Sequence, residues 1–148
     1  MIGRKITADD VEPGTWANYE LGAAIDAGTY VGALQKMQAW ARRAISWWCD
    51  DGFDLLLTPT LAEPPPLLGD MTDPETGGGR LLTFALFGAP FNVTGQPAMS
   101  VPLGMSKSGL PIGVQLVGAP YREDLLFRVA AQLETAAPWA ERRPPIHA

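Results

Sequence analysis

The sequence has one cysteine and one histidine among its 148 residues, which limits the chemistry that it can carry. A single cysteine excludes an internal disulfide and a metal site built from several thiolates of this chain. We interpret Cys49 as an inert thiol buried beside Trp47 and Trp48. The histidine, His147, lies one residue from the end, where a solvent-exposed side chain is the better interpretation than a catalytic base. No Gly-x-Ser-x-Gly motif is present, and we expect neither a cofactor nor a metal site.

Long apolar runs and clustered positive charge are also missing. No stretch approaches the ~20 consecutive apolar residues that span a bilayer, and the first residues lack the apolar core of a signal peptide. Lys and Arg total 11 against 16 Asp and Glu, which gives a formal net charge of −5. A nucleic-acid-binding protein usually concentrates basic residues on one face, and no such run occurs here. These features predict a cytoplasmic globular protein that binds neither nucleic acid nor a membrane.

The apolar pattern predicts helices alternating with buried strands, which is the α/β class. The expected helices cover residues 16–25, 30–48 and 122–136, and the apolar stretch 81–91 should form a short helix that ends before Pro90. The expected strands cover residues 53–58, 98–103 and 112–117, and the first of them should be buried on both faces. Proline and glycine runs predict a surface loop over residues 62–80. Gln115 lies in a strand that is apolar on both sides, so it must find hydrogen-bond partners if it is buried.

Short motifs that could carry chemistry fail on their context. Ser106-Lys107-Ser108 looks like a Ser–Lys dyad, but it lies in a polar hairpin turn, where we expect a solvated lysine that does not act as a base. Asp70, Asp73 and Glu75 lack the ligand spacing of a calcium loop, although these acids could hold a cation weakly. The run of three glycines before Arg80 matches neither phosphate-binding glycine motif. The chain therefore contains no complete catalytic set.

Four linked motifs are more informative than any single residue. They comprise residues 53–60, Asn92-Val93-Thr94-Gly95-Gln96-Pro97-Ala98, Val101-Pro102-Leu103-Gly104 and residues 109–118. In order and spacing they resemble the C-terminal third of amidase-signature enzymes, and residues 7–50 resemble the helical lead-in of that family. The resemblance covers nearly the whole chain.

The resemblance implies a mixed β-sheet flanked by helices, with residues 1–148 as a single domain. Residues 1–50 would be the lead-in, and 51–148 would hold the strands, a pocket-wall helix and the C-terminal helix. The family's catalytic Ser–cis-Ser–Lys triad lies in a Gly/Ser-rich segment that does not occur here, so we assign no catalytic residue. The expected role is to complete the sheet and wall the substrate pocket of an amidase, without activity in isolation. We also expect that the exposed sheet edge could support a homodimer.

The resemblance also identifies substrate-binding residues. In the family, the helix before the Asn-x-x-Gly-x-Pro motif faces the acyl side of the pocket. Here that helix would present one shared face, formed by Leu82, Ala85, Leu86 and Ala89. Ala85 lies seven residues before Asn92, where the family's ammonia-supplying subunit for misacylated tRNA has an aspartate that grips the amino group of glutamine. An apolar residue there indicates a small-molecule amide substrate that is apolar or neutral.

A second hypothesis stays open at this point. The chain could be a stand-alone, non-catalytic module that derives from an amidase and serves binding or oligomerisation. A Gly/Ser-rich segment with paired serines upstream in the same reading frame would favour the enzyme, and its lack would favour the module.

Overall fold

The computed structural model describes residues 3–73 and 76–144, which form a three-stranded antiparallel sheet with helices around it. The strand order is β1-β3-β2, with β1 at Leu55–Pro59, β2 at Ala98–Met105 and β3 at Pro111–Gly118. The central strand β3 pairs with both neighbours, and Gln115 lies opposite Thr58 of β1 and Ser100 of β2. The α/β class is confirmed, and the strands within these residues are all antiparallel.

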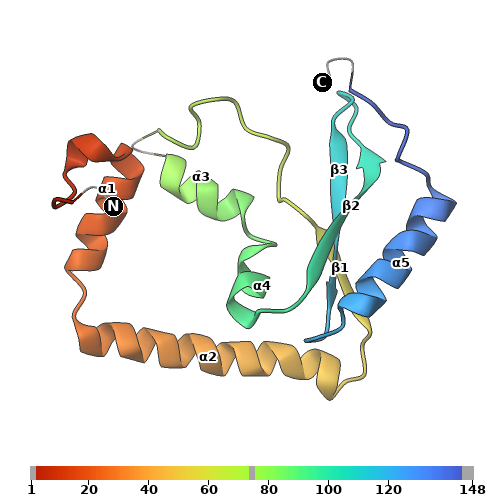
Figure 1. Ribbon diagram of the computed structural model, residues 1–148, viewed down its shortest axis with the longest axis horizontal. Helices are drawn as coiled ribbons and strands as arrows, with labels where there is room; N and C mark the ends of the chain where they lie inside the picture. Colours follow the sequence, from red (N-terminus) through yellow and green to blue (C-terminus); the bar gives the residue numbers. More distant parts are fainter. Residues whose placement is uncertain (1–2, 74–75, 145–148) are drawn as a thin grey trace.

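Helices precede, interrupt and follow the strands. They are η1 (Ala8–Asp10), α1 (Pro13–Ala23), α2 (Ala27–Cys49), α3 (Gly77–Phe84), α4 (Ala89–Thr94) and α5 (Glu123–Ala136). Asp26 caps the long helix α2, because its Oδ1 accepts a hydrogen bond from the Thr29 backbone N–H at 2.9 Å. Figure 1 shows α5 on one side of the sheet, α3 and α4 on the other, and α2 running across the base of the view. No helix among the described residues has the length and apolar character to cross a membrane.

The β2–β3 hairpin follows from its turn residues. Gly109 adopts a φ of +81°, a left-handed conformation that favours glycine, and Ser106 Oγ accepts a hydrogen bond from the Leu110 N–H at 2.9 Å. The ladder is irregular between Val101 and Gly104, where Pro102 has no N–H to donate. Both predicted strands of this hairpin are confirmed.

The core lies between the sheet and α5. Val101 of β2, Leu116 of β3 and Leu126 of α5 form its buried centre. Residues directly opposite in an antiparallel pair point to the same face, so Leu57, which pairs with Leu116, also points to the α5 side. Gln115, Thr58 and Ser100 point to the opposite face. This second face carries the groups described below.

The short helix predicted within residues 81–91, ending before Pro90, has different bounds in the structure. Helix α3 covers Gly77–Phe84, a turn occupies residues 85–88, and a second helix, α4, begins at Ala89 and includes Pro90. Pro90 lacks the N–H that would continue the ladder to the Leu86 carbonyl, and it fits instead in the first turn of a new helix. The turn is closed by hydrogen bonds from the N–H groups of Gly88 and Ala89 to the Ala85 carbonyl, both 3.0 Å.

The predicted loop over residues 62–80 ends earlier than expected. Gly77 opens helix α3 in close contact with the Met71 backbone, where a Cβ would clash with the Met71 carbonyl. The glycine run therefore starts a helix because one of its members allows a close backbone approach.

Two predictions of burial are wrong. Strand β1 lies at an edge of the described sheet, and Leu57 is 62% exposed rather than buried. Cys49 is exposed at the end of α2, while Trp48 beside it is buried and Trp47 stacks on Phe53 with ring centroids 4.2 Å apart. The helix predicted over residues 30–48 is confirmed as α2, and that over 122–136 as α5.

Candidate functional site

The predicted substrate-binding residues lie along the α3–α4 segment, but they do not share one helix. Leu82 belongs to α3 and is 76% exposed, Ala85 and Leu86 lie in the turn, and Ala89 is the first residue of α4. Because a turn separates the two helices, these four residues do not form one face of a helix. They remain neighbours in the chain on the side of the sheet away from α5 (Figure 1).

The Gln115 side chain joins the turn at residues 85–88 to the sheet. Its side chain is only 7% exposed, and its Nε2 donates to the Phe87 carbonyl at 2.9 Å and to Thr58 Oγ1 at 3.0 Å. One amide group therefore joins β3, β1 and the turn that carries Ala85 and Leu86. The sequence requirement that a buried Gln115 must find partners is confirmed.

Replacing Gln115 by leucine should loosen the turn. Gln115→Leu leaves the Phe87 carbonyl without its donor, which costs about 1–3 kcal/mol if the carbonyl stays buried. We expect lower stability and faster hydrogen exchange at the Gly88 and Ala89 amides, measured by exchange mass spectrometry.

A matched control is available at Gln96. Its Nε2 donates to the Gly118 carbonyl at 2.8 Å and it is as buried as Gln115, but it lies beyond α4. Gln96→Leu should reduce stability without a selective increase in the hydrogen-exchange rates of the Gly88 and Ala89 amides. If both variants increased the exchange rates of these amides equally, Gln115 would have no specific role in stabilising the turn.

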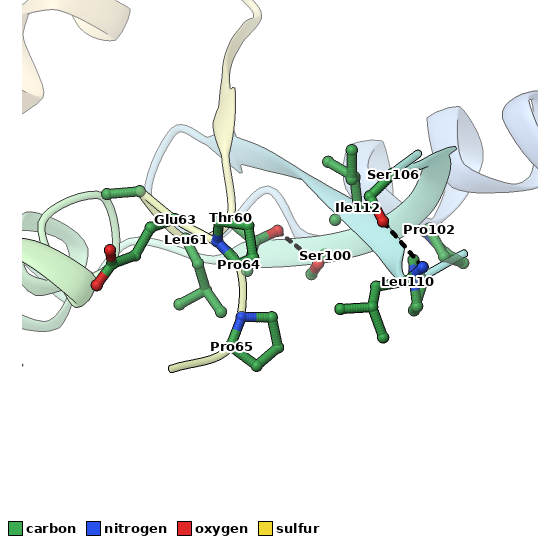
Figure 2. Close-up of a pocket in the computed structure, with 13 residues that line it drawn as sticks. Thr60, Leu61, Glu63, Pro64, Pro65, Ser100, Pro102, Ser106, Leu110 and Ile112 are labelled. Carbon is green, nitrogen blue, oxygen red and sulfur yellow. Dashed lines mark hydrogen bonds between the residues drawn. The ribbon is translucent and has the colours of Figure 1, made fainter. Parts of the chain in front are cut away.

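A concavity lies farther along the same face of the sheet. It encloses about 540 Å³ between the loop that follows β1 and the β2–β3 hairpin. Its lining residues are Thr60, Leu61, Ala62, Glu63, Pro64, Pro65, Ser100, Pro102, Ser106, Leu110, Pro111, Ile112 and Gly113. Figure 2 shows Thr60 and Ser100 directed toward each other, and their hydroxyl oxygens are 2.6 Å apart.

The polar residues singled out from the sequence have structural contacts. Asp70 and Asp73 accept hydrogen bonds from the backbone N–H groups of Leu67 and Thr76 at 3.2 and 2.8 Å, which organises the loop before α3. Arg80 lies 3.5 Å from Asp70 and 3.4 Å from Glu63. Within the ranges that the structure covers, no three potential ligands gather into a metal site.

The remaining sequence candidates do not assemble a catalytic group. Ser106 Oγ is 2.9 Å from Ser108 Oγ and accepts from the Leu110 N–H, as expected of a hairpin turn. Glu75 and His147 lie outside the described residues. The hydrogen bonds on the face away from α5 join hydroxyl, amide and carbonyl groups, which can orient a ligand but are not general bases.

The pairing of Thr60 with Ser100 could not be found from the sequence. The two residues are 40 positions apart, and they meet only because the strand register places both beside Gly113 of β3. A signal existed at Gly113, where glycine interrupts a run of β-branched and apolar residues and suggests a close approach.

Comparison with known proteins shows the family. The family model described as Amidase matches residues 5–127. The chain belongs to the amidase family. It is 41% identical, over 158 aligned residues, to the 6-aminohexanoate-cyclic-dimer hydrolase of Pseudomonas sp. (strain NK87), and the match covers 99% of this chain and 31% of that hydrolase. The chain thus spans about a third of the length of this curated relative.

Solved structures confirm the fold. The structure of a 6-aminohexanoate cyclic dimer hydrolase complexed with substrate matches with a TM-score of 0.87 and 42% identity, over 97% of this chain and 32% of that one. A bacterial aryl acylamidase of the amidase signature enzymes family matches with a TM-score of 0.63 and 25% identity, over 92% of this chain and 30% of that one. The sheet and its helices are therefore part of the amidase-signature fold.

Proposed function

We propose that this chain forms the C-terminal part of an amidase, which hydrolyses a carbon–nitrogen amide bond to a carboxylate and ammonia or an amine. The observation that carries the proposal is the family match over residues 5–127. The four linked motifs support the assignment to the C-terminal third. In this proposal residues 1–148 act as a single cytoplasmic domain that completes the sheet and walls the substrate pocket.

Exposed apolar side chains support a role inside a larger enzyme. Leu57 on the edge strand is 62% exposed, Leu68 is fully exposed, and Tyr30 and Met37 of α2 are 59% and 41% exposed. Large apolar surfaces of this kind are usually covered by another part of the protein. Additional strands of the same enzyme would pair with the open edge of β1; without them, a second copy of the chain at that edge would give a homodimer.

The turn and its neighbours define the proposed substrate class. Leu82, Ala85, Leu86 and Ala89 would form an apolar wall on the acyl side of the pocket, which favours a neutral amide over a charged one. The relative's name supports this choice, since a cyclic dimer of 6-aminohexanoate is a neutral diamide with methylene chains. We propose a neutral aliphatic amide as the substrate of the complete enzyme.

The isolated chain should have no amidase activity. Its sequence holds no Gly/Ser-rich segment with paired serines, and within residues 3–73 and 76–144 the Thr60–Ser100 hydroxyl pair has no base among its hydrogen-bond partners. The test compares the release of an aryl amine from a simple anilide by the chain alone and by the chain joined to the coding sequence upstream. We expect turnover only in the joined protein.

Two outcomes would contradict the proposal in different ways. Turnover by the chain alone that Ser100→Ala abolishes would place the nucleophile in this chain. No turnover by either protein, combined with an upstream sequence that lacks paired serines in a Gly/Ser-rich segment, would favour the stand-alone binding module.

A further inference from the structure

The concavity beside the Thr60–Ser100 pair has the features of a binding site for a small neutral molecule. We propose that it binds a ligand with an apolar body of a few methylene groups and one hydrogen-bond acceptor, such as the carbonyl of a primary amide. This proposal concerns the chain alone and does not require that the chain act in amide hydrolysis.

The depth of the concavity depends on Gly113. A Cβ built at this position would lie 2.6 Å from Thr60 Oγ1 and 2.7 Å from Ser100 Oγ, closer than real Cβ atoms approach oxygen. Glycine therefore leaves room for the two hydroxyl groups to meet over the strand. Any other residue would have to push them apart and fill the floor.

One hydroxyl hydrogen of the Thr60–Ser100 pair is not used in the hydrogen bond between them. The Thr60 and Ser100 oxygens are 2.6 Å apart, so one hydroxyl donates to the other. The hydroxyl that accepts keeps its own hydrogen, and a hydroxyl group has one donor and two acceptor positions. That hydrogen is available to an acceptor on a ligand, and Figure 2 shows the pair at the concavity with Leu61, Pro64 and Leu110 around it.

The surroundings favour a neutral ligand. Most of the lining is carbon, from Leu61, Pro64, Pro65, Leu110 and Ile112 among others. Glu63 is the charged residue of the lining, and it shares Arg80 with Asp70 at 3.4 and 3.5 Å, so this group of three keeps one net negative charge. A carboxylate ligand would lose its hydration and meet the Glu63 carboxylate, while a carbonyl group would avoid both costs. The volume of about 540 Å³ is within the range of small-molecule sites, roughly 300–1,000 Å³.

The test is a titration of the ¹⁵N-labelled chain with hexanamide and with hexanoate, which have the same length but differ in charge. Hexanamide should shift the backbone signals of residues 60–63, 100–101 and 110–113 in a saturable manner. Hexanoate should bind at least about tenfold more weakly, the factor expected for about 1.4 kcal/mol of desolvation and charge repulsion.

Three variants separate the contributions. Thr60→Val combined with Ser100→Ala keeps the shape but removes both hydroxyl groups, and it should weaken hexanamide binding about fivefold, as expected for one neutral hydrogen bond. Gly113→Ala should abolish binding by filling the floor. Gly32→Ala, where the added Cβ meets no atom within 4 Å, is the matched glycine control and should bind normally.

Several results would overturn the proposal. They are shifts confined to the exposed face of α2, equal binding of both probes, unchanged affinity in the Thr60→Val/Ser100→Ala variant, or no saturable binding of hexanamide. Because the Thr60→Val/Ser100→Ala variant preserves the packing volume, it keeps the test decisive even if Gly113→Ala fails to fold. A failed amidase assay with intact hexanamide binding would refute the proposed function and leave this site standing.

Discussion

Leu116→Ala should reduce the free energy of unfolding by about 2–5 kcal/mol, the range for removing a buried leucine side chain. Leu116 is 1% exposed at the centre of β3 and packs with Val101 and Leu126 in the core against α5. The chain buries few large apolar side chains, and typical domains have only about 5–15 kcal/mol of stability in total. The variant should therefore unfold at a much lower denaturant concentration.

The matched control lies directly across the sheet. Leu57 pairs with Leu116 in the register and points to the same face, but it is 62% exposed. Leu57→Ala should change stability by no more than about 0.5 kcal/mol, as surface substitutions usually do. Urea denaturation followed by circular dichroism measures both. An equal loss in the two variants would show that Leu57 is covered in solution, as the proposed homodimer at the β1 edge would require.

The elements with strong local signals could be predicted from the sequence. The β2–β3 hairpin is punctuated by Gly109 and Pro111, and α5 has an acidic first turn and a clear apolar stripe, so local chemistry specifies both. Helix α2 is likewise specified by its Asp26 cap and its apolar spacing. In these elements the local preference and the final contacts agree.

The errors arose where long-range contacts decide the outcome. The run Leu55-Leu56-Leu57 within β1 is apolar, but the number of strands around it determines whether Leu57 is buried, and that number is not a local property. The predicted helix face had the spacing of Leu82, Ala85, Leu86 and Ala89, yet α3 ends at Phe84, and Gln115 donates a hydrogen bond to the Phe87 carbonyl of the turn that follows. The neighbours of Cys49 in the chain do not cover it: Cys49 is exposed, while Trp48 is buried and Trp47 stacks on Phe53.

In the candidate site, too, some features could be predicted from local sequence and others depend on long-range contacts. The need for partners at Gln115 could be predicted because a buried amide must be paired wherever it lies. The identity of those partners, Thr58 and the Phe87 carbonyl, depends on strand register and on the turn. Two hydroxyl groups 40 residues apart leave no joint signal in the sequence, so the concavity appeared only in the folded chain.

Ala85→Asp should change substrate choice in the amidase that contains this segment. If the turn walls the acyl side of the pocket, the introduced carboxylate meets an apolar acyl group and loses hydration. The kcat/KM for a neutral aliphatic amide should fall about 10- to 100-fold, which corresponds to about 1.4–2.7 kcal/mol of lost transition-state stabilisation. An amide that carries an amino group at the matching position should lose less or gain.

The structure of the turn separates this effect from a loss of stability. The Ala85 backbone carbonyl accepts the hydrogen bonds that close the turn, so a new side chain leaves those bonds in place. A negative charge at the end of α3 opposes the helix dipole, and at the half-buried Ala85 this costs up to about 2 kcal/mol, which the melting curves measure. Ala85→Asn, which has nearly the same shape without the charge, is the matched control and should affect both substrates alike. Kinetics on the two amides, with melting curves of both variants, distinguish the outcomes. A large drop in melting temperature with equal losses on both amides would make Ala85 a packing residue, because a structural defect cannot distinguish one acyl group from another.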